Sequence, residues 1–320
     1  MKKYIKRYKG VETTFQFYPA EILPGGFPIS TPLTFPFIGQ NLIITRKRNG
    51  WWDIPGGKME KEENWEDAIK REAYEEAGIE IDNISLVGYV LATNKGAEEK
   101  LTYPAKNLLP VTISFVKRVE KEWQKKETLD REAPSRDEVK EFFSTRQDNG
   151  QLLEMFNHVT SFYDKQGYQQ TFEYFPEDEK EGIPNTQAMV FIRTTTDKFI
   201  VVRDFKKTTF ALPGGGCGIN ESGMDCAVRE SREEAQVEIT DLQFLGTILV
   251  KIKKNKDIIS VSAQKRYLAR TEKLSRFVPR KDGFETIERG LVDFKDLYKE
   301  VHSLQNDTGN AILENLKNKL

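Results

Sequence analysis

Two groups of glutamates stand at the same spacing behind a Pro-Gly-Gly turn in the two halves of the chain. The first lies in PGGKMEKEENWEDAIKREAYEEAG, from Pro55 to Gly78, and the second follows Pro213. Carboxylate oxygens at three- and four-residue spacing share one face of a helix and suit a hard divalent cation, Mg²⁺ above all, which also accepts a substrate phosphate. The candidate metal ligands are Glu72, Glu75 and Glu76 in the first half and Glu230, Glu233 and Glu234 in the second.

These glutamates interrupt the face that their helix would otherwise bury. In the first half, an apolar stripe through Ala68 and Ile69 continues at helical spacing onto Glu72 and Glu76. Gly78 is the expected C-cap, so Glu76 lies in the last turn, where an acid opposes the helix dipole at a cost of ~0.3–1 kcal/mol. A solvated acidic face would explain one such helix. It does not explain why the same spacing occurs twice, whereas a bound cation explains both.

The two halves repeat one unit. Pro55 recurs as Pro213, a shift of 158 residues, and the glutamates behind each turn keep their spacing. Upstream, the strand-like NLIITRK that begins at Asn41 lies over KFIVVRD around Phe199. A repeat near half the length of the chain indicates two domains of one fold rather than a solenoid of short units.

We therefore expect an N-terminal domain at residues 1–175, a charged linker at 176–187 and a C-terminal domain at 188–320. The linker PEDEKEGIPNTQ contains both Gly and Pro, which favour a connecting segment. The N-terminal domain opens with an extension rich in proline and aromatic residues. A further PGG there, at Pro24, has no glutamates behind it and is expected to be an ordinary turn.

Within the first domain, the pattern after the glutamate helix predicts strands near 85–93 and 111–119 and a helical stretch over 137–165. Each copy contains strands, the PGG turn, a helix of about a dozen residues, further strands and late helices. The fold class is therefore α/β.

Composition narrows the function classes. The chain has 320 residues and a formal net charge of −1, which argues against a nucleic-acid partner bound through a broad basic surface. No apolar stretch approaches the ~20 residues of a membrane span, so we expect no membrane partner. Two cysteines, Cys217 and Cys226, cannot make a disulfide framework, so we expect a reducing, cytoplasmic location.

The glutamates and glycines together resemble the box of the Nudix hydrolase family, G-x5-E-x7-R-E-U-x-E-E-x-G-U, where U is bulky and apolar. The first copy reads Gly57, Glu63, Arg71, Glu72, Ala73, Glu75, Glu76, Gly78, Ile79. The second reads Gly215, Glu221, Arg229, Glu230, Ser231, Glu233, Glu234, Gln236, Val237. Nine spaced positions make the signal specific, and with the flanking strands it covers most of the chain as a tandem Nudix protein.

This resemblance implies two α/β/α sandwich domains, each with a mixed β-sheet and a loop-helix-loop box. It implies Mg²⁺ or Mn²⁺ on the six candidate ligands, and catalytic roles for Glu72, Glu76, Glu230 and Glu234. It also implies that Glu63 pairs with Arg71 and Glu221 with Arg229, with Gly57 and Gly215 as structural positions of the box. Phosphate binding by the two arginines is the alternative, and we expect the ion pair to be their main role.

The implied reaction is Mg²⁺-dependent hydrolysis of the diphosphate linkage in a nucleoside diphosphate joined to another group, by a pyrophosphohydrolase acting on acid anhydrides. A diphosphate repels an attacking hydroxide, so cations must neutralise its oxygens and a carboxylate must take a proton from the water. The expected partner is a small-molecule nucleotide. One alternative is a nucleotide-sensing or binding protein in which one or both domains do not turn over substrate. Another is a nucleic-acid-processing relative.

The second copy departs from the box at two positions. Ser231 replaces an apolar residue and Gln236 replaces the capping glycine, where a left-handed non-glycine residue costs ~1–2 kcal/mol. All five charged positions remain, so we expect two potentially competent sites. The alternative is that the second copy is a binding half, with an intramolecular pseudo-dimer or a homodimer as the assembly.

A few other residues have candidate roles. Trp51 aligns with a threonine in the second copy, so the shared core does not require it, and it is a candidate for stacking on a base. Trp52 and Phe210 align with each other and are expected in the cores. Cys217 has no partner spaced for a zinc site and is expected to be a spare thiol. The loop acids Glu98 and Glu99 are weaker candidates for a further ligand or base.

Overall fold

The computed structural model describes residues 3–8, 10–96, 104–125, 127–144, 148, 150–205, 207–279 and 286–320. The chain folds into two compact units. Unit 1 contains Met1–Gln169 and Ile252–Ser260, and unit 2 contains Gln170–Lys251 and Val261–Leu320. This division comes earlier in the chain than the predicted linker at 176–187, whose last residues lie in a strand that begins at Asn185.

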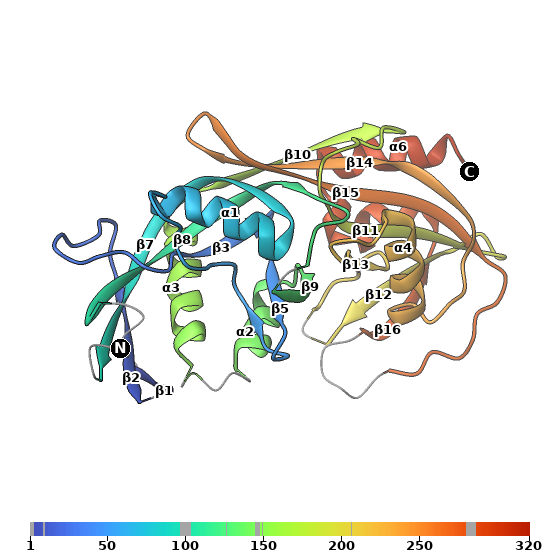
Figure 1. Ribbon diagram of the computed structural model, residues 1–320. Coiled ribbons are helices and arrows are strands. Elements are labelled where there is room, and N and C mark those ends of the chain that lie inside the picture. The colour runs from blue at the N-terminus through green and yellow to red at the C-terminus, as the bar shows by residue number, and fades with distance from the viewer. Residues whose placement is uncertain are drawn as a thin grey trace. The chain divides into compact units, whose positions relative to one another are not determined.

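Unit 1 is built around a mixed sheet with the order β1-β2-β7-β8-β3-β4, in which β3 and β8 are parallel (Figure 1). A second sheet has the order β6-β5-β9. The strands are β1 (Lys3–Tyr8), β2 (Val11–Pro19), β3 (Leu33–Ile38), β4 (Asn41–Leu42), β5 (Ile44–Lys47), β6 (Trp52–Asp53), β7 (Ile79–Lys95), β8 (Lys106–Val119) and β9 (Thr128–Glu132). The helices are α1 (Trp65–Ala77), α2 (Arg136–Ser144) and α3 (Gln151–Lys165).

Helices cover both faces of this sheet because alternate strand residues point to opposite sides. Phe35 and Phe37 of β3 pack in one buried cluster with Phe143 of α2 and Phe156 of α3. The box helix α1 contacts β7 and β3 from the other side, as Figure 1 shows. The result is an α/β/α sandwich. The predicted strands at 85–93 and 111–119 are parts of β7 and β8, and the predicted helical stretch is two helices.

Unit 2 repeats the arrangement around a mixed sheet with the order β10-β14-β15-β11-β12-β16, in which β11 and β15 are parallel and β13 pairs with β11. The strands are β10 (Gln169–Pro176), β11 (Asn185–Thr194), β12 (Phe199–Asp204), β13 (Gly214–Gly216), β14 (Thr240–Lys254), β15 (Asp257–Thr271) and β16 (Thr286–Val292). The helices are α4 (Gly223–Glu233), α5 (Leu297–Glu300) and α6 (Asp307–Lys317), with short 3-10 turns η2 (Phe294–Asp296) and η3 (His302–Leu304).

Two apolar clusters lie on the two faces of this sheet. Val201 of β12 packs with Leu297 of α5 and Ile312 of α6. Its neighbour Val202 packs with Ala227 of α4 on the opposite face. The predicted fold class, two α/β/α sandwiches with a mixed sheet in each, is confirmed. No helix among the described residues is long and apolar enough to cross a membrane.

The start of each box helix follows from its sequence. Asn64 caps α1 by accepting a hydrogen bond from the Asp67 N–H at 2.8 Å, and Ser222 caps α4 by accepting one from the Asp225 N–H at 3.1 Å. Such side-chain caps satisfy N–H groups that have no partner inside the helix. The two caps are equivalent, because Asn64 and Ser222 are separated by the repeat length of 158 residues.

The two box helices end differently. Gly78 closes α1 in the left-handed conformation, with φ 59°, as expected. In the second copy Gln236 also adopts a left-handed conformation, with φ 52°. Its side chain offsets part of the strain, because it donates to the Val278 carbonyl at 2.7 Å and accepts from the Val278 N–H at 3.0 Å. Ser231 is fully buried and donates to the Ala227 carbonyl at 2.7 Å, so its hydroxyl is satisfied inside α4.

A distant arginine caps the end of each box helix. Arg131 of β9 is buried and donates to the carbonyls of Ala77 and Gly78, the latter at 3.1 Å. Arg289 of β16, 158 residues later, donates to the Ala235 carbonyl at 2.8 Å. These guanidinium groups satisfy helix-end carbonyls and place positive charge at the negative end of the dipole.

Replacing Arg131 by Met should therefore leave carbonyls at the end of α1 buried without a donor. We expect the free energy of unfolding to fall by ~1–3 kcal/mol, measured by urea denaturation. The matched control is Arg118→Met, because Arg118 is on the same unit but is largely exposed. Equal effects of the two changes would contradict the capping role of Arg131.

Candidate functional site

Each box helix turns carboxylates toward the interior of its unit. We call Glu72, Glu75 and Glu76 the N-terminal site, and Glu230, Glu233 and Glu234 the C-terminal site. The side chains that interrupt the apolar stripe are the buried ones: Glu72 is 9% exposed, Glu76 3% and Glu230 7%. Glu75 and Glu234 are half-buried and Glu233 is exposed. The helices therefore do not simply present a solvated acidic face.

The Pro-Gly-Gly segment positions the carboxylates from the opposite side. The Gly56 N–H donates to Glu76 Oε2 at 3.1 Å, and the Gly214 N–H donates to Glu234 Oε2 at 2.8 Å. The second glycine of each turn makes room for the first carboxylate. A Cβ on Gly57 would lie 2.2 Å from the Glu72 carboxylate.

The equivalent approach occurs in the second copy, where a Cβ on Gly215 would lie 2.6 Å from Glu230 Oε1. Since real Cβ atoms do not come this close to another heavy atom, only glycine fits without moving the acid. The box glycines are thus required by close approach to a carboxylate, with no need for a special backbone angle at either position.

The expected ion pairs are present in both copies. Arg71 donates to the two oxygens of Glu63 at 2.9 and 3.0 Å, and Nη1 donates to Glu72 Oε1 at 2.7 Å. Arg229 does the same with Glu221, at 2.9 Å to each oxygen, and with Glu230 at 2.6 Å. A bidentate pair of this kind is directional as well as strong. Each arginine therefore holds the first carboxylate of its site in place, and direct phosphate binding by either arginine stays a prediction.

Burial dominates the electrostatics of the site carboxylates. It raises the pKa of Glu72 and of Glu230 above the usual range, although the neighbouring arginine lowers the pKa in each case. Burial also raises the pKa of Glu76, against the lowering effect of the Lys47 ammonium group. The hydrogen bond from Arg71, by contrast, lowers the pKa of Glu63. Negative charge in these sites is thus costly without a nearby cation.

The C-terminal site has the stronger perturbation. Burial raises the pKa of Glu234 to about 8, and the charges of Glu230, Asp204 and Glu233 add to this effect. The hydrogen bond from the Gly214 N–H acts in the opposite direction.

Lys47 is a site residue that the sequence motif did not indicate. It lies at the end of β5, 21% exposed, and its Nζ contacts Glu76 Oε1. The signal for it was weak, because a lysine at a strand end is usually solvated and its partner is 29 residues away.

The site carboxylates fit a hard divalent cation. All the candidate donors are oxygens, which Mg²⁺ prefers. Glu72 and Glu76 are buried on one face of α1, and Glu230 is buried in the second copy. A positive group already lies against the most buried of them, because the Lys47 ammonium contacts Glu76. The residues at both sites therefore fit the cation that the box implies.

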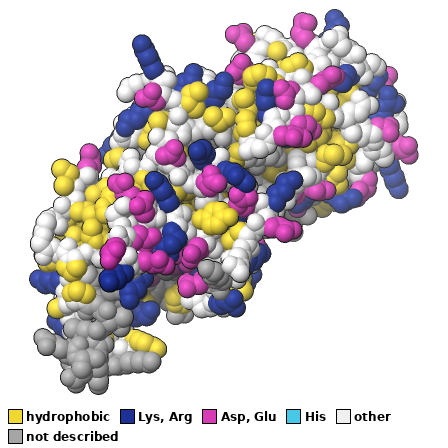
Figure 2. Space-filling view, turned by 45° about the horizontal axis from the view of Figure 1, so that its top comes forward, with side chains coloured by type: hydrophobic (Ala, Val, Ile, Leu, Met, Phe, Trp, Pro, Cys, Tyr) yellow, Lys and Arg dark blue, Asp and Glu magenta, His cyan; other side chains and the backbone are white. Residues whose placement is uncertain are grey.

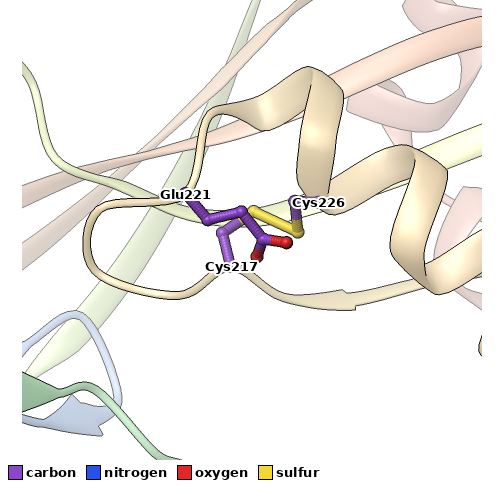
Figure 3. A group of neighbouring side chains, drawn as sticks. All are labelled: Cys217, Glu221 and Cys226. Carbon is purple, nitrogen blue, oxygen red and sulfur yellow. A yellow bond between two sulfur atoms is a disulfide. The ribbon is translucent and has the colours of Figure 1, made fainter.

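The prediction of a spare thiol at Cys217 is wrong. Cys217 and Cys226 form a disulfide, which Figure 3 shows between the loop after Gly216 and the first turn of α4. The sequence interpretation considered the loop alone, whereas the turn into α4 brings the two Cα atoms to 5.3 Å. One disulfide is not a disulfide framework, so the reducing, cytoplasmic location stays a prediction.

Glu221 lies beside this disulfide, with a carboxylate oxygen and the two sulfurs within 4.8 Å of one another (Figure 3). The two sulfurs are bonded to each other and Glu221 is paired with Arg229. These groups therefore support the box loop, and we assign them no metal.

The aromatic residues that the two copies share lie in the cores, as the alignment of the copies predicted. Trp52 packs on the core of unit 1, with its ring 5.3 Å from that of Phe142, and Phe210 packs on the core of unit 2. Trp51 is 38% exposed, and its role in stacking stays a prediction. Glu98 and Glu99 lie outside the described residues. On the face in Figure 2, lysine and arginine side chains lie among acidic ones rather than in one continuous basic surface.

The two regions that carry the boxes also match a known protein family. The model of the NUDIX domain matches this chain twice, at residues 35–159 and 183–310. A MutT-like protein of Streptomyces ambofaciens is 40% identical over 58 residues, which are 18% of this chain and 38% of that protein. The uncharacterized Nudix hydrolase YvcI of Bacillus subtilis is 49% identical over 47 residues, 15% of this chain and 30% of that protein. The chain thus spans about a third of the length of these curated relatives.

Solved structures are similar over single domains. The Bacillus subtilis pyrophosphohydrolase BsRppH is 22% identical, with a TM-score of 0.38 over 47% of this chain and 92% of that one. A NUDIX hydrolase from Nitrosomonas europaea is 13% identical, with a TM-score of 0.33 over 43% and 90%. An ADP-ribose pyrophosphatase from Streptococcus suis is 14% identical, with a TM-score of 0.29 over 42% and 90%.

The close approach at Gly57 yields a stability prediction. Gly57→Ala should push the Glu72 carboxylate out of place and cost ~1–3 kcal/mol of unfolding free energy, measured by denaturant titration. Gly25→Ala is the matched control, because that glycine belongs to the ordinary Pro-Gly-Gly turn and has no atom within 4 Å of the added Cβ. A neutral Gly57→Ala variant would contradict the packing described above.

The raised pKa of Glu234 predicts how the stability of the metal-free protein, kept in a chelator, depends on pH. Its folded pKa of about 8 exceeds the usual value of 4.5, so the folded state binds more protons between these values. Its contribution to stability is therefore present below about pH 4.5 and is lost as the pH rises through about 8. Glu234→Gln is neutral at every pH. Thermal unfolding should show the melting temperature of the wild type falling relative to this variant from about pH 5 to pH 9. A difference in melting temperature that does not change with pH would contradict the raised pKa of Glu234.

Proposed function

Because the chain belongs to the NUDIX family, with one such domain in each half, we propose that it is a Mg²⁺-dependent hydrolase with Mn²⁺ as an alternative cation. The proposed substrates are nucleoside diphosphates linked to another group, and the bond cleaved is the diphosphate linkage. The observation that supports this most is the burial of Glu72 and Glu76 on one face of α1, repeated by Glu230 on α4. A protein that only binds a nucleotide has no evident need for such mutually repelling acids.

The proposed metal ligands are the three glutamates of each site. A divalent cation bound there would neutralise the diphosphate oxygens and make a bound water more acidic. The chain's own residues have three tasks. Glu72 and Glu230 orient and deprotonate the attacking water. Arg71 and Arg229 hold these two carboxylates through hydrogen bonds of 2.7 and 2.6 Å. The turn N–H groups of Gly56 and Gly214 hold Glu76 and Glu234.

The raised pKa values support this division of labour. A carboxylate accepts a proton more readily when burial raises its pKa, and this holds for Glu72 and Glu230. Trp51 is exposed and comes four residues before Pro55 in the chain, and it is the proposed surface for stacking on a base.

Isosteric removal of one carboxylate in each site tests the proposal. With Mg²⁺ and a panel of nucleoside diphosphate derivatives, the double variant Glu76→Gln and Glu234→Gln should lose at least ~100-fold in rate. If both sites turn over substrate independently, the rates of the two single variants should add up to that of the wild type. Glu66→Gln is the matched control, because it lies on the exposed side of the first turn of α1.

Two outcomes would separate the alternatives. A double variant that keeps the wild-type rate would contradict hydrolysis at these sites. A wild type that binds nucleotides with Mg²⁺ but shows no turnover on the panel would favour the nucleotide-sensing alternative.

A further inference from the structure

The strand beside each box helix carries opposite charges at equivalent positions in the two copies. In unit 1, Lys47 at the end of β5 pairs in register with Thr128 of β9, after a local register shift. In unit 2, Asp204 at the end of β12 pairs with Thr286 of β16, also after a register shift. Thr286 follows Thr128 by the repeat length of 158 residues, so the two strand ends correspond.

Neighbouring positions confirm that this correspondence is structural. Thr45 of β5 pairs with Arg131, the arginine that caps α1, and Val202 of β12 pairs with Arg289, which caps α4. Lys47 and Asp204 each follow two residues later on their strand. The loop that leads to the Pro-Gly-Gly turn is one residue longer in the second copy, since Pro55 comes eight positions after Lys47 and Pro213 comes nine after Asp204.

The two side chains act on the last glutamate of their site in opposite ways. Lys47 makes an ion pair with Glu76 and lowers the cost of that buried charge. Among the described residues, Glu234 has no lysine or arginine partner, and its carboxylate accepts a hydrogen bond from the Gly214 N–H. The nearby charge of Asp204 adds to its repulsion. The pair of Arg71 with Glu63 recurs as Arg229 with Glu221. The arginines differ only at the middle glutamate, which lies 2.9 Å from Arg229 and 3.8 Å from Arg71, so they do not offset the difference at the last one.

We propose that this charge reversal makes the two sites unequal in their affinity for a divalent cation, with the C-terminal site binding it more tightly. This inference rests on the proposed function, because it takes the glutamates as the metal ligands. At the N-terminal site an incoming cation must displace or face the Lys47 ammonium, which already neutralises Glu76. At the C-terminal site the described residues place no ammonium group against Glu234, and the Asp204 carboxylate adds negative charge near it. Such charges interact strongly where water is partly excluded.

The consequence is a difference in loading between the two halves of one chain. Over a range of Mg²⁺ concentration the C-terminal site is filled while the N-terminal site is still largely empty. Lys47 and Asp204 are thus specificity-determining residues for metal loading, and they act through charge without belonging to the box.

Calorimetric titration of the full chain with Mn²⁺ alone, without nucleotide, tests the inference. We expect two classes of site that differ at least ~10-fold in dissociation constant. Glu234→Gln should weaken the tighter class and Glu76→Gln the weaker one. Lys47→Met should tighten the weaker class and Asp204→Asn should weaken the tighter class, each by about tenfold. Lys61→Met and Asp257→Asn are controls with the same chemistry at exposed positions, and neither should change either class.

Asp204→Lys keeps the test decisive if Lys47→Met does not fold. It places an ammonium group beside Glu234, as in the first copy, and should bring the tighter class down to the weaker one. Two sites of equal affinity, or affinities that change less than about twofold in Lys47→Met and Asp204→Lys, would overturn the inference and leave the proposed function standing. No Mn²⁺ binding at either site would overturn both.

Discussion

The constraint on which both halves depend is that carboxyl groups lie on the inner face of a helix, near its negative end, where burial makes their charge costly. Glu76 is 3% exposed and its pKa is raised by burial, as is that of Glu72. Carboxylates so placed repel one another and oppose the helix dipole. Much of the surrounding structure can be understood as a set of positive groups and N–H donors that make this arrangement tolerable.

Those groups come from several elements around the helix. The turn before the helix supplies the Gly56 N–H, the helix itself supplies Arg71, and β5 supplies Lys47. From the second sheet, Arg131 reaches the carbonyls at the end of α1, and Thr128 donates to the Glu76 carbonyl at 2.7 Å. The strands that flank the helix thus position the site and also neutralise part of its charge.

The sequence predicted the parts of this arrangement that depend on local structure. The cap at Gly78 and the place of the glutamates on the inner face follow from spacings within one helix. The pair of Arg71 and Glu63 is what the resemblance to the box implied. The partners that it missed are set by tertiary structure. Lys47 and Arg131 come from strands whose register the sequence does not reveal. The disulfide of Cys217 and Cys226 depends on how the loop returns over α4.

The second copy shows which parts of the box can change. Gln236 replaces the capping glycine, yet the backbone stays left-handed and the side chain forms hydrogen bonds with Val278. Ser231 likewise fits the core by donating to a carbonyl inside its own helix. Neither departure moves Glu230 away from Gly215 or Arg229. The box of the second copy is therefore not collapsed, and the charges beside the last glutamate, Lys47 in one copy and Asp204 in the other, are a difference that can set the two sites apart.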